Sequence, residues 1–232
     1  MIVRALALVW RRLPLYAAGA ACVIGAQALV ALVWRVPFGL AYSSFIVPPL
    51  LTTLVYAFAW ADSDDAPQGA SATWERVLDR AWAVIVIDLV TTILVSTGLN
   101  GILAQDPVDI VLGCVILLIC APLVFADTSA TVDEMPVWWL LPGAFWRSLR
   151  TARGETYLRA IAILAFGLIP ALLQPRLLDW MQAKDLANAD FWSSVPLNAV
   201  TLVPIAVLTA LVYRDATRKA PNTETETKEI GD

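Results

Sequence analysis

Residues 82–104, WAVIVIDLVTTILVSTGLNGILA, decide the fold class of this chain. The segment is long and apolar enough to cross the hydrocarbon core of a bilayer, which takes about 20 residues of α-helix. Its one charged side chain is Asp88. Because lipid offers the backbone no hydrogen-bond partners, a segment of this kind crosses the membrane as a helix.

Five further segments have the same character: 14–34, 36–60, 108–126, 157–174 and 195–213. The composition agrees, with 59% hydrophobic residues, 16% charged residues and a mean hydropathy of +0.70, whereas soluble domains carry about 25% charge. We therefore predict an all-α polytopic membrane protein with six transmembrane helices. Residues 1–213 form one transmembrane domain, and residues 214–232 form a cytoplasmic, mostly disordered tail.

Lys and Arg residues set the expected orientation. With six spans both termini lie on one side, and that side holds 13 of the 16 Lys and Arg residues, while the other holds 3. Both termini are therefore expected in the cytoplasm, as in a multi-pass protein of the bacterial inner membrane. The connections between spans one and two and between spans three and four are very short, and this predicts three helical hairpins.

The composition also excludes several functional classes. The chain has no histidine, and its 20 acidic residues outnumber 16 basic ones, so neither a histidine-based catalytic or metal site nor a nucleic-acid footprint is expected. Cys22, Cys114 and Cys120 lie in apolar runs, without the spacing of a zinc site. We expect no enzyme activity, no cofactor and no metal.

A polar stripe crosses the third span. Its members are four residues apart, so they share one face of a helix: Asp88, Thr92, Ser96 and Asn100. Counting 1.5 Å per residue from the cytoplasmic ends places Thr52 and Tyr56 of span two, with Thr53 and Thr209, near the depth of Asp88. The same count places Gln27, Ser96 and Asn198 in a deeper layer.

Asp88 has two interpretations. Charged groups inside a membrane mark transport pathways, but a hydrogen-bonded network between helices is the structural alternative. Asp88 has no predicted intramembrane carboxylate partner, because the segment after Ala126, residues 127–156, is expected to be a cytoplasmic connection.

Prolines lie at the centres of two predicted spans, Pro48 and Pro49 in the second and Pro204 in the sixth. A proline inside a helix removes one hydrogen bond and bends the helix. Broken helices of this kind occur in transporters, and ordinary membrane helices tolerate proline as well, so a structural kink stays open beside a functional one.

Segments that mix tryptophan and arginine precede each predicted hairpin, and the third is the most developed. Its helix, residues 143–153, is expected to place Phe145, Leu149 and Ala152 on an apolar face at the membrane interface. We call the residues that flank this face the basic segment: Trp146, Arg147, Arg150 and Arg153. It is either a linker along the membrane or a docking site for anionic lipid or a partner protein.

Two motifs in this region carry a resemblance. Residues 121–127, APLVFAD, and residues 145–154, FWRSLRTARG, resemble the inner end of span four and the segment before span five in bacterial six-span proteins of the YciC type. They are also similar to the membrane domain of some glycerophosphodiester phosphodiesterases. The similarity covers roughly residues 70–213. It implies an all-helical integral membrane protein and transfers no catalytic residues.

Two functional hypotheses follow. The first is a non-enzymatic membrane-organising or accessory protein that binds membrane lipids or other membrane proteins through its helices and basic segment. The alternative is a small-solute or ion transporter or channel that uses Asp88 and the proline-containing spans two and six. The sequence does not indicate an oligomeric state.

Overall fold

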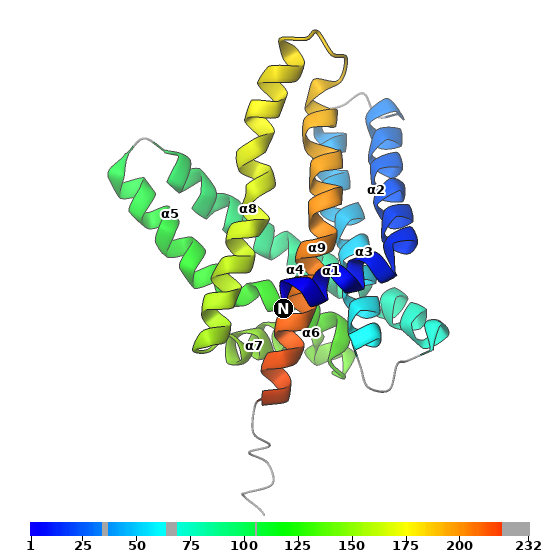
Figure 1. The fold of residues 1–232 in the computed structure, drawn as a ribbon. Helices are drawn as coiled ribbons and strands as arrows, with labels where there is room; N and C mark the ends of the chain where they lie inside the picture. The colour runs from blue at the N-terminus through cyan, green and yellow to red at the C-terminus, as the bar shows by residue number, and fades with distance from the viewer. Residues whose placement is uncertain (34–36, 64–68, 105, 220–232) are drawn as a thin grey trace, which may run out of the picture.

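The computed structural model describes residues 1–33, 37–63, 69–104 and 106–219, and every regular element within these ranges is helical. Figure 1 shows long helices α2, α3, α8 and α9 standing side by side, with α4 crossing obliquely behind them and α5 leaning away to one side. The elements are α1 (Ile2–Arg11), α2 (Leu13–Val33), α3 (Pro37–Ser63), α4 (Ala70–Leu103), α5 (Pro107–Cys120), η1 (Ala121–Phe125), α6 (Ala126–Val132), η2 (Val137–Trp139), α7 (Leu140–Thr151), α8 (Glu155–Gln182) and α9 (Ala189–Lys219).

Five helical segments within the described ranges are long and apolar enough to cross a membrane. They are Leu13–Val30, Ala70–Leu103, Pro107–Val132, Glu155–Gln182 and Ala189–Arg218. Between half and five-sixths of each apolar window stays unburied within the bundle, as expected where lipid rather than water covers the outer surface. The predicted all-helical class is therefore confirmed, with five helices among the described residues that are long and apolar enough for a multi-pass membrane protein.

The helix that begins as α5 continues past the predicted end of span four. It passes through η1 into α6, where all seven residues are buried. The connection expected to start at Asp127 therefore begins as a buried helix, which extends the apolar helical segment to Val132. Thr128, Ser129 and Thr131 lower the hydropathy of this stretch, yet they face the bundle interior, which a hydropathy pattern does not register.

Two other predicted boundaries also move. Helix α4 begins at Ala70 instead of residue 82, so the tryptophan and arginine of its first turns belong to the long helix. Helix α9 continues to Lys219, and the boundary expected between residues 213 and 214 therefore falls inside a helix. Residues 220–232, the rest of the predicted tail, lie outside the described residues.

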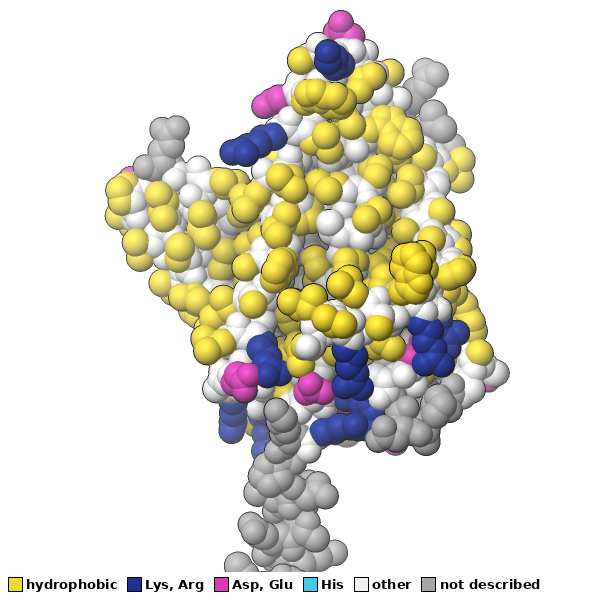
Figure 2. Space-filling view, in the orientation of Figure 1, with side chains coloured by type: hydrophobic (Ala, Val, Ile, Leu, Met, Phe, Trp, Pro, Cys, Tyr) yellow, Lys and Arg dark blue, Asp and Glu magenta, His cyan; other side chains and the backbone are white. Residues whose placement is uncertain are grey.

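Helix α9 lies at the centre of the bundle and packs against α1, α2, α3 and α8. Within it, Val207, Leu211 and Tyr213 are almost completely buried. Figure 2 shows Lys and Arg side chains gathered below a hydrophobic flank, at the end of the molecule that carries α6, α7 and the last turns of α9. We call this end the basic end.

An ion pair fixes the start of α2 to the end of α3 at the basic end. The Arg12 guanidinium donates to both carboxylate oxygens of Asp62, at 2.8 and 2.7 Å, and lies 5.6 Å from the centre of the Phe58 ring. The hydrogen bond to Asp62 raises the pKa of Arg12 above its usual value. The Asp62 side chain is only 5% exposed. The ion pair with Arg12 therefore offsets the cost of burying the Asp62 charge.

Helices α4 and α5 approach each other through glycines. A Cβ atom added to Gly113 of α5 would lie 2.5 Å from the carbonyl oxygen of Gly98 and 2.7 Å from the amide nitrogen of Ile102, both on α4. Backbones can approach this closely only where side chains are absent. The two helices therefore form a tight pair whose geometry depends on Gly98 and Gly113.

Candidate functional site

A cavity of about 470 Å³ lies between α2, α3, α4, α6, α8 and α9. Along α9 its wall runs from Ser194 to Ala206, a rise of about 18 Å. Polar side chains from different helices meet in it: Gln27, Thr52, Tyr56, Asp88, Thr92, Ser96, Asp127, Ser194, Asn198 and Thr201. We call it the central cavity.

The central cavity brings together most of the intramembrane residues singled out in the sequence. Asp88, Thr92 and Ser96 of α4 line it, with Thr52 and Tyr56 of α3. The predicted deeper layer also meets there, because Gln27 and Asn198 line the same space as Ser96.

Two of the predicted polar residues lie elsewhere. Asn100 is exposed and does not line the central cavity, because a four-residue step overshoots a helical turn and the stripe drifts around α4. Thr53 is fully buried, and its hydroxyl donates to the Pro49 carbonyl oxygen at 2.7 Å.

Asp127 is the site residue that the sequence reasoning missed. It is 9% exposed and lines the cavity that Asp88 lines, so the expectation that Asp88 has no intramembrane carboxylate nearby is wrong. Its Oδ1 atom is buried and has no hydrogen-bond partner among the described residues. A buried, unpartnered carboxylate oxygen is costly in this environment. The available signal was the absence of Gly or Pro between Ala126 and Met135, which permits the helix to continue.

A second cavity of about 210 Å³ is lined by the same two carboxylates. It lies between α4 and α8, above η1, and we call it the lateral cavity. Its walls include Leu123 and Val124 of η1 and Ile163 and Leu164 of α8. Among the described residues that line either cavity there is no Lys or Arg. Asp88 and Asp127 are therefore the charged side chains of the described lining of both cavities.

Packed side chains close the basic end below the two carboxylates. Phe125 and Tyr213 are buried with ring centres 5.9 Å apart, and Trp60 lies 6.2 Å from Tyr213. The Tyr213 hydroxyl donates to Asp133, which also accepts a hydrogen bond from Ser129 at 2.6 Å. This network joins α9 to the end of α6.

The prolines line different spaces. Pro48 lines the central cavity, and the Thr52 hydroxyl donates to its carbonyl oxygen at 3.0 Å. Pro49 is bonded in the same manner by Thr53. Pro204 instead lines a third, apolar pocket. The hydroxyls near Pro48 and Pro49 therefore bond to helix backbone instead of facing a ligand.

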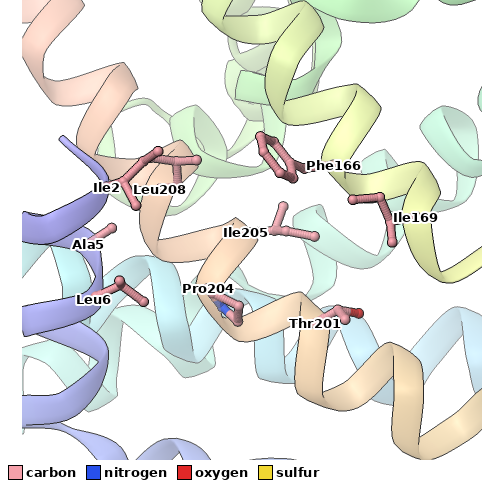
Figure 3. Close-up of a pocket in the computed structure, with 9 residues that line it drawn as sticks. All are labelled: Ile2, Ala5, Leu6, Phe166, Ile169, Thr201, Pro204, Ile205 and Leu208. Atoms are coloured by element: carbon pink, nitrogen blue, oxygen red, sulfur yellow. The ribbon is translucent and has the colours of Figure 1, made fainter.

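That third pocket has a volume of about 240 Å³ and lies between α1, α8 and α9. Figure 3 shows Ile2 and Leu6 of α1 facing Phe166 and Ile169 of α8 across α9. Its one polar residue, Thr201, donates its hydroxyl to the Leu197 carbonyl oxygen at 2.7 Å. The pocket therefore offers a hydrophobic surface and no charged group.

The basic segment lies on and just after α7, and another face of this helix packs against the bundle. Leu140, Ala144 and Ser148 face the bundle, and the Ser148 hydroxyl donates to the Pro122 carbonyl oxygen. Leu149, a member of the predicted interfacial face, is 46% exposed, whereas α7 packs on η1 and α6 through the residues of the 140–144–148 line.

The four members of the basic segment divide into two roles. Arg147 forms an ion pair with Asp133 at 3.3 Å and so contributes to the fold. Trp146, at 56% exposure, points outward, and Arg150 and Arg153 are exposed as well. These three remain accessible to lipid headgroups or to a partner.

No family model, curated protein or solved structure matches this chain. The resemblance to YciC-type proteins therefore stays a prediction. Within the described ranges, no group of three or more acidic or cysteine side chains is placed to hold a metal ion.

Proposed function

We propose that this protein is a membrane transporter that binds a cation at Asp88 and Asp127 in the central cavity. The observation that carries the proposal is the buried, unpartnered Oδ1 atom of Asp127, in a cavity that Asp88 also lines. Two carboxylates in a poorly solvated space favour a positive ligand, because the ligand supplies the charge that the described lining lacks. The protein's role is then solute movement and not catalysis.

The proposed topology has six crossings. The sixth is α3, which at 27 residues is about 40 Å long and packs between α2, α4 and α9. The basic end faces the cytoplasm of a bacterial inner membrane, in line with the distribution of Lys and Arg. In this orientation the packed aromatic groups close the cytoplasmic side, and the central cavity extends toward the opposite side.

The proposal is tested by uptake of two cations into proteoliposomes. Wild-type protein is expected to take up tetramethylammonium, ethidium or both above the level of empty liposomes. Asp88→Asn is expected to reduce that uptake at least about tenfold, because loss of a charged partner costs about 1.5–3 kcal/mol.

Asp179→Asn is the matched control, since Asp179 is an exposed residue near the opposite end of α8. Equal melting temperatures for all three proteins show that the fold is intact. Uptake of neither cation by the wild-type protein contradicts the transport function, and unchanged uptake by Asp88→Asn contradicts a cation site at Asp88.

A second function, the binding of anionic lipid in a membrane-organising role, is supported by the exposed members of the basic segment. Each surface arginine contributes about 1 kcal/mol of attraction to anionic lipid. Arg150→Gln combined with Arg153→Gln is therefore expected to weaken the binding of phosphatidylglycerol about 20- to 30-fold. Titration of a short-chain phosphatidylglycerol into the solubilised protein measures this affinity.

The matched control replaces two exposed cations at the other end, Arg176→Gln with Lys184→Gln. An equal loss of affinity in both double variants points to net charge alone. It would overturn the assignment of lipid binding to the basic segment.

A further inference from the structure

We infer that the ligand of the two carboxylates is an amphipathic organic cation that enters sideways from the bilayer, between α4 and α8. The inference rests on the proposed function and specifies its substrate class. It is carried by the lateral cavity, in which Asp88 and Asp127 lie beside apolar side chains of η1 and α8.

The central and lateral cavities meet at the acidic pair. Both are lined by Asp88 and Asp127, and both are bordered by Gly167 of α8. A Cβ atom added to Gly167 would meet nothing within 4 Å, so the wall is open at this position. A ligand in the lateral cavity therefore reaches the carboxylates without passing through the length of the central one.

The lateral cavity faces lipid because α5 and α8 separate above their shared base. The Tyr157 hydroxyl of α8 donates to the Leu118 carbonyl oxygen of α5 at 2.9 Å, and η1 packs against α8 at the same level. Farther from the basic end α5 leans away from α8 (Figure 1), leaving a notch bordered by hydrophobic side chains (Figure 2). Both helices belong to membrane-spanning segments, so hydrocarbon borders this notch.

The lining specifies the chemistry of the ligand. The lateral cavity presents two carboxylates beside the apolar side chains of Leu123, Val124, Ile163 and Leu164. A small hydrated cation would lose its water shell in such a passage without compensation. An amphipathic cation instead keeps its apolar part in hydrocarbon and brings its charge to the buried Oδ1 of Asp127.

The test compares two cations on the whole protein in nanodiscs of zwitterionic lipid, with empty nanodiscs as the blank. Ethidium represents the amphipathic class and tetramethylammonium the small polar class. Wild-type protein is expected to bind ethidium at least about tenfold more tightly. Gly167→Leu fills the open position on the wall that both cavities share, and because its side chain takes up space that the ligand needs, it is expected to lower ethidium affinity at least about tenfold, or about 1.4 kcal/mol.

Gly25→Leu is the matched control. A Cβ atom added to Gly25 of α2 also meets nothing within 4 Å, and Gly25 lines neither cavity. Leu164→Trp is a second test variant. Leu164 lines the lateral cavity and not the central one, so the larger side chain narrows the lateral cavity. Tighter binding of tetramethylammonium, or ethidium binding that neither substitution alters, overturns lateral entry while the proposed function stands. Binding of neither cation overturns the proposed function itself.

Discussion

Replacing Asp127 by asparagine is expected to lower the affinity of the protein for ethidium about 10- to 100-fold. The substitution keeps the size of the side chain and removes its charge. Interactions with a charged group contribute about 1.5–3 kcal/mol, which corresponds to this range of affinity. Because Oδ1 of Asp127 has no partner among the described residues, few interactions within the fold are lost with the charge. Titration of ethidium into nanodisc-embedded protein measures the effect.

The same substitution is expected to leave the melting temperature unchanged or to raise it, because an unpartnered buried carboxyl group destabilises the folded state. This separates a ligand-binding carboxylate from a structural one. A lower melting temperature with unaltered ethidium affinity would mean that Asp127 stabilises the helix bundle and binds nothing. Asp179→Asn again serves as the exposed acidic control.

Gly113→Ala is expected to produce the largest loss of stability from a single methyl group. The new Cβ atom would lie 2.5 Å from the backbone oxygen of Gly98, and backbone at this distance can move only if α4 and α5 separate. Overfilled contacts cost about 1–3 kcal/mol and sometimes more. Thermal unfolding in detergent, followed by the helical circular dichroism signal, measures the loss.

The matched control for this prediction is Gly25→Ala, where the same methyl group meets no atom within 4 Å. It is expected to leave the melting temperature unchanged or slightly higher, because alanine favours the helix over glycine. Equal stability of the two alanine variants would contradict the close packing of α4 against α5.

The helical membrane class follows from the sequence because hydrocarbon imposes a strong and local constraint. A run such as residues 82–104 has to form a helix whatever surrounds it. The four-residue spacing of Asp88, Thr92 and Ser96 is equally local, and it correctly predicts that these residues share a face. In the structure this face borders the central cavity.

The missed features depend on contacts between helices. Asp127 follows an apolar run and precedes Thr128 and Ser129, a pattern typical of a span leaving the membrane. It remains inside because α7 and η1 cover that end of the bundle. Likewise, nothing local in the sequence indicates that Gly98 and Gly113 face each other, or that Arg12 pairs with Asp62.

The cavity also changes the weight of the two functional hypotheses. A lone intramembrane carboxylate on α4 is compatible with a structural network, since a single group can be satisfied by neighbouring hydroxyls. Two carboxylates in a shared cavity, without a basic residue in the described lining, favour a cationic ligand. The exposed side chains Trp146, Arg150 and Arg153 lie outside that cavity, so lipid binding there is compatible with transport.

The most direct test is a calorimetric titration of the wild-type protein and the Asp88→Asn, Asp127→Asn double variant with ethidium and tetramethylammonium, in nanodiscs of zwitterionic lipid. An acidic binding site in the membrane predicts that at least one cation binds the wild-type protein saturably, near one per chain. It predicts no saturable binding to the double variant when the latter is folded. Absence of saturable binding to the wild-type protein, or equal binding to both proteins, would contradict it.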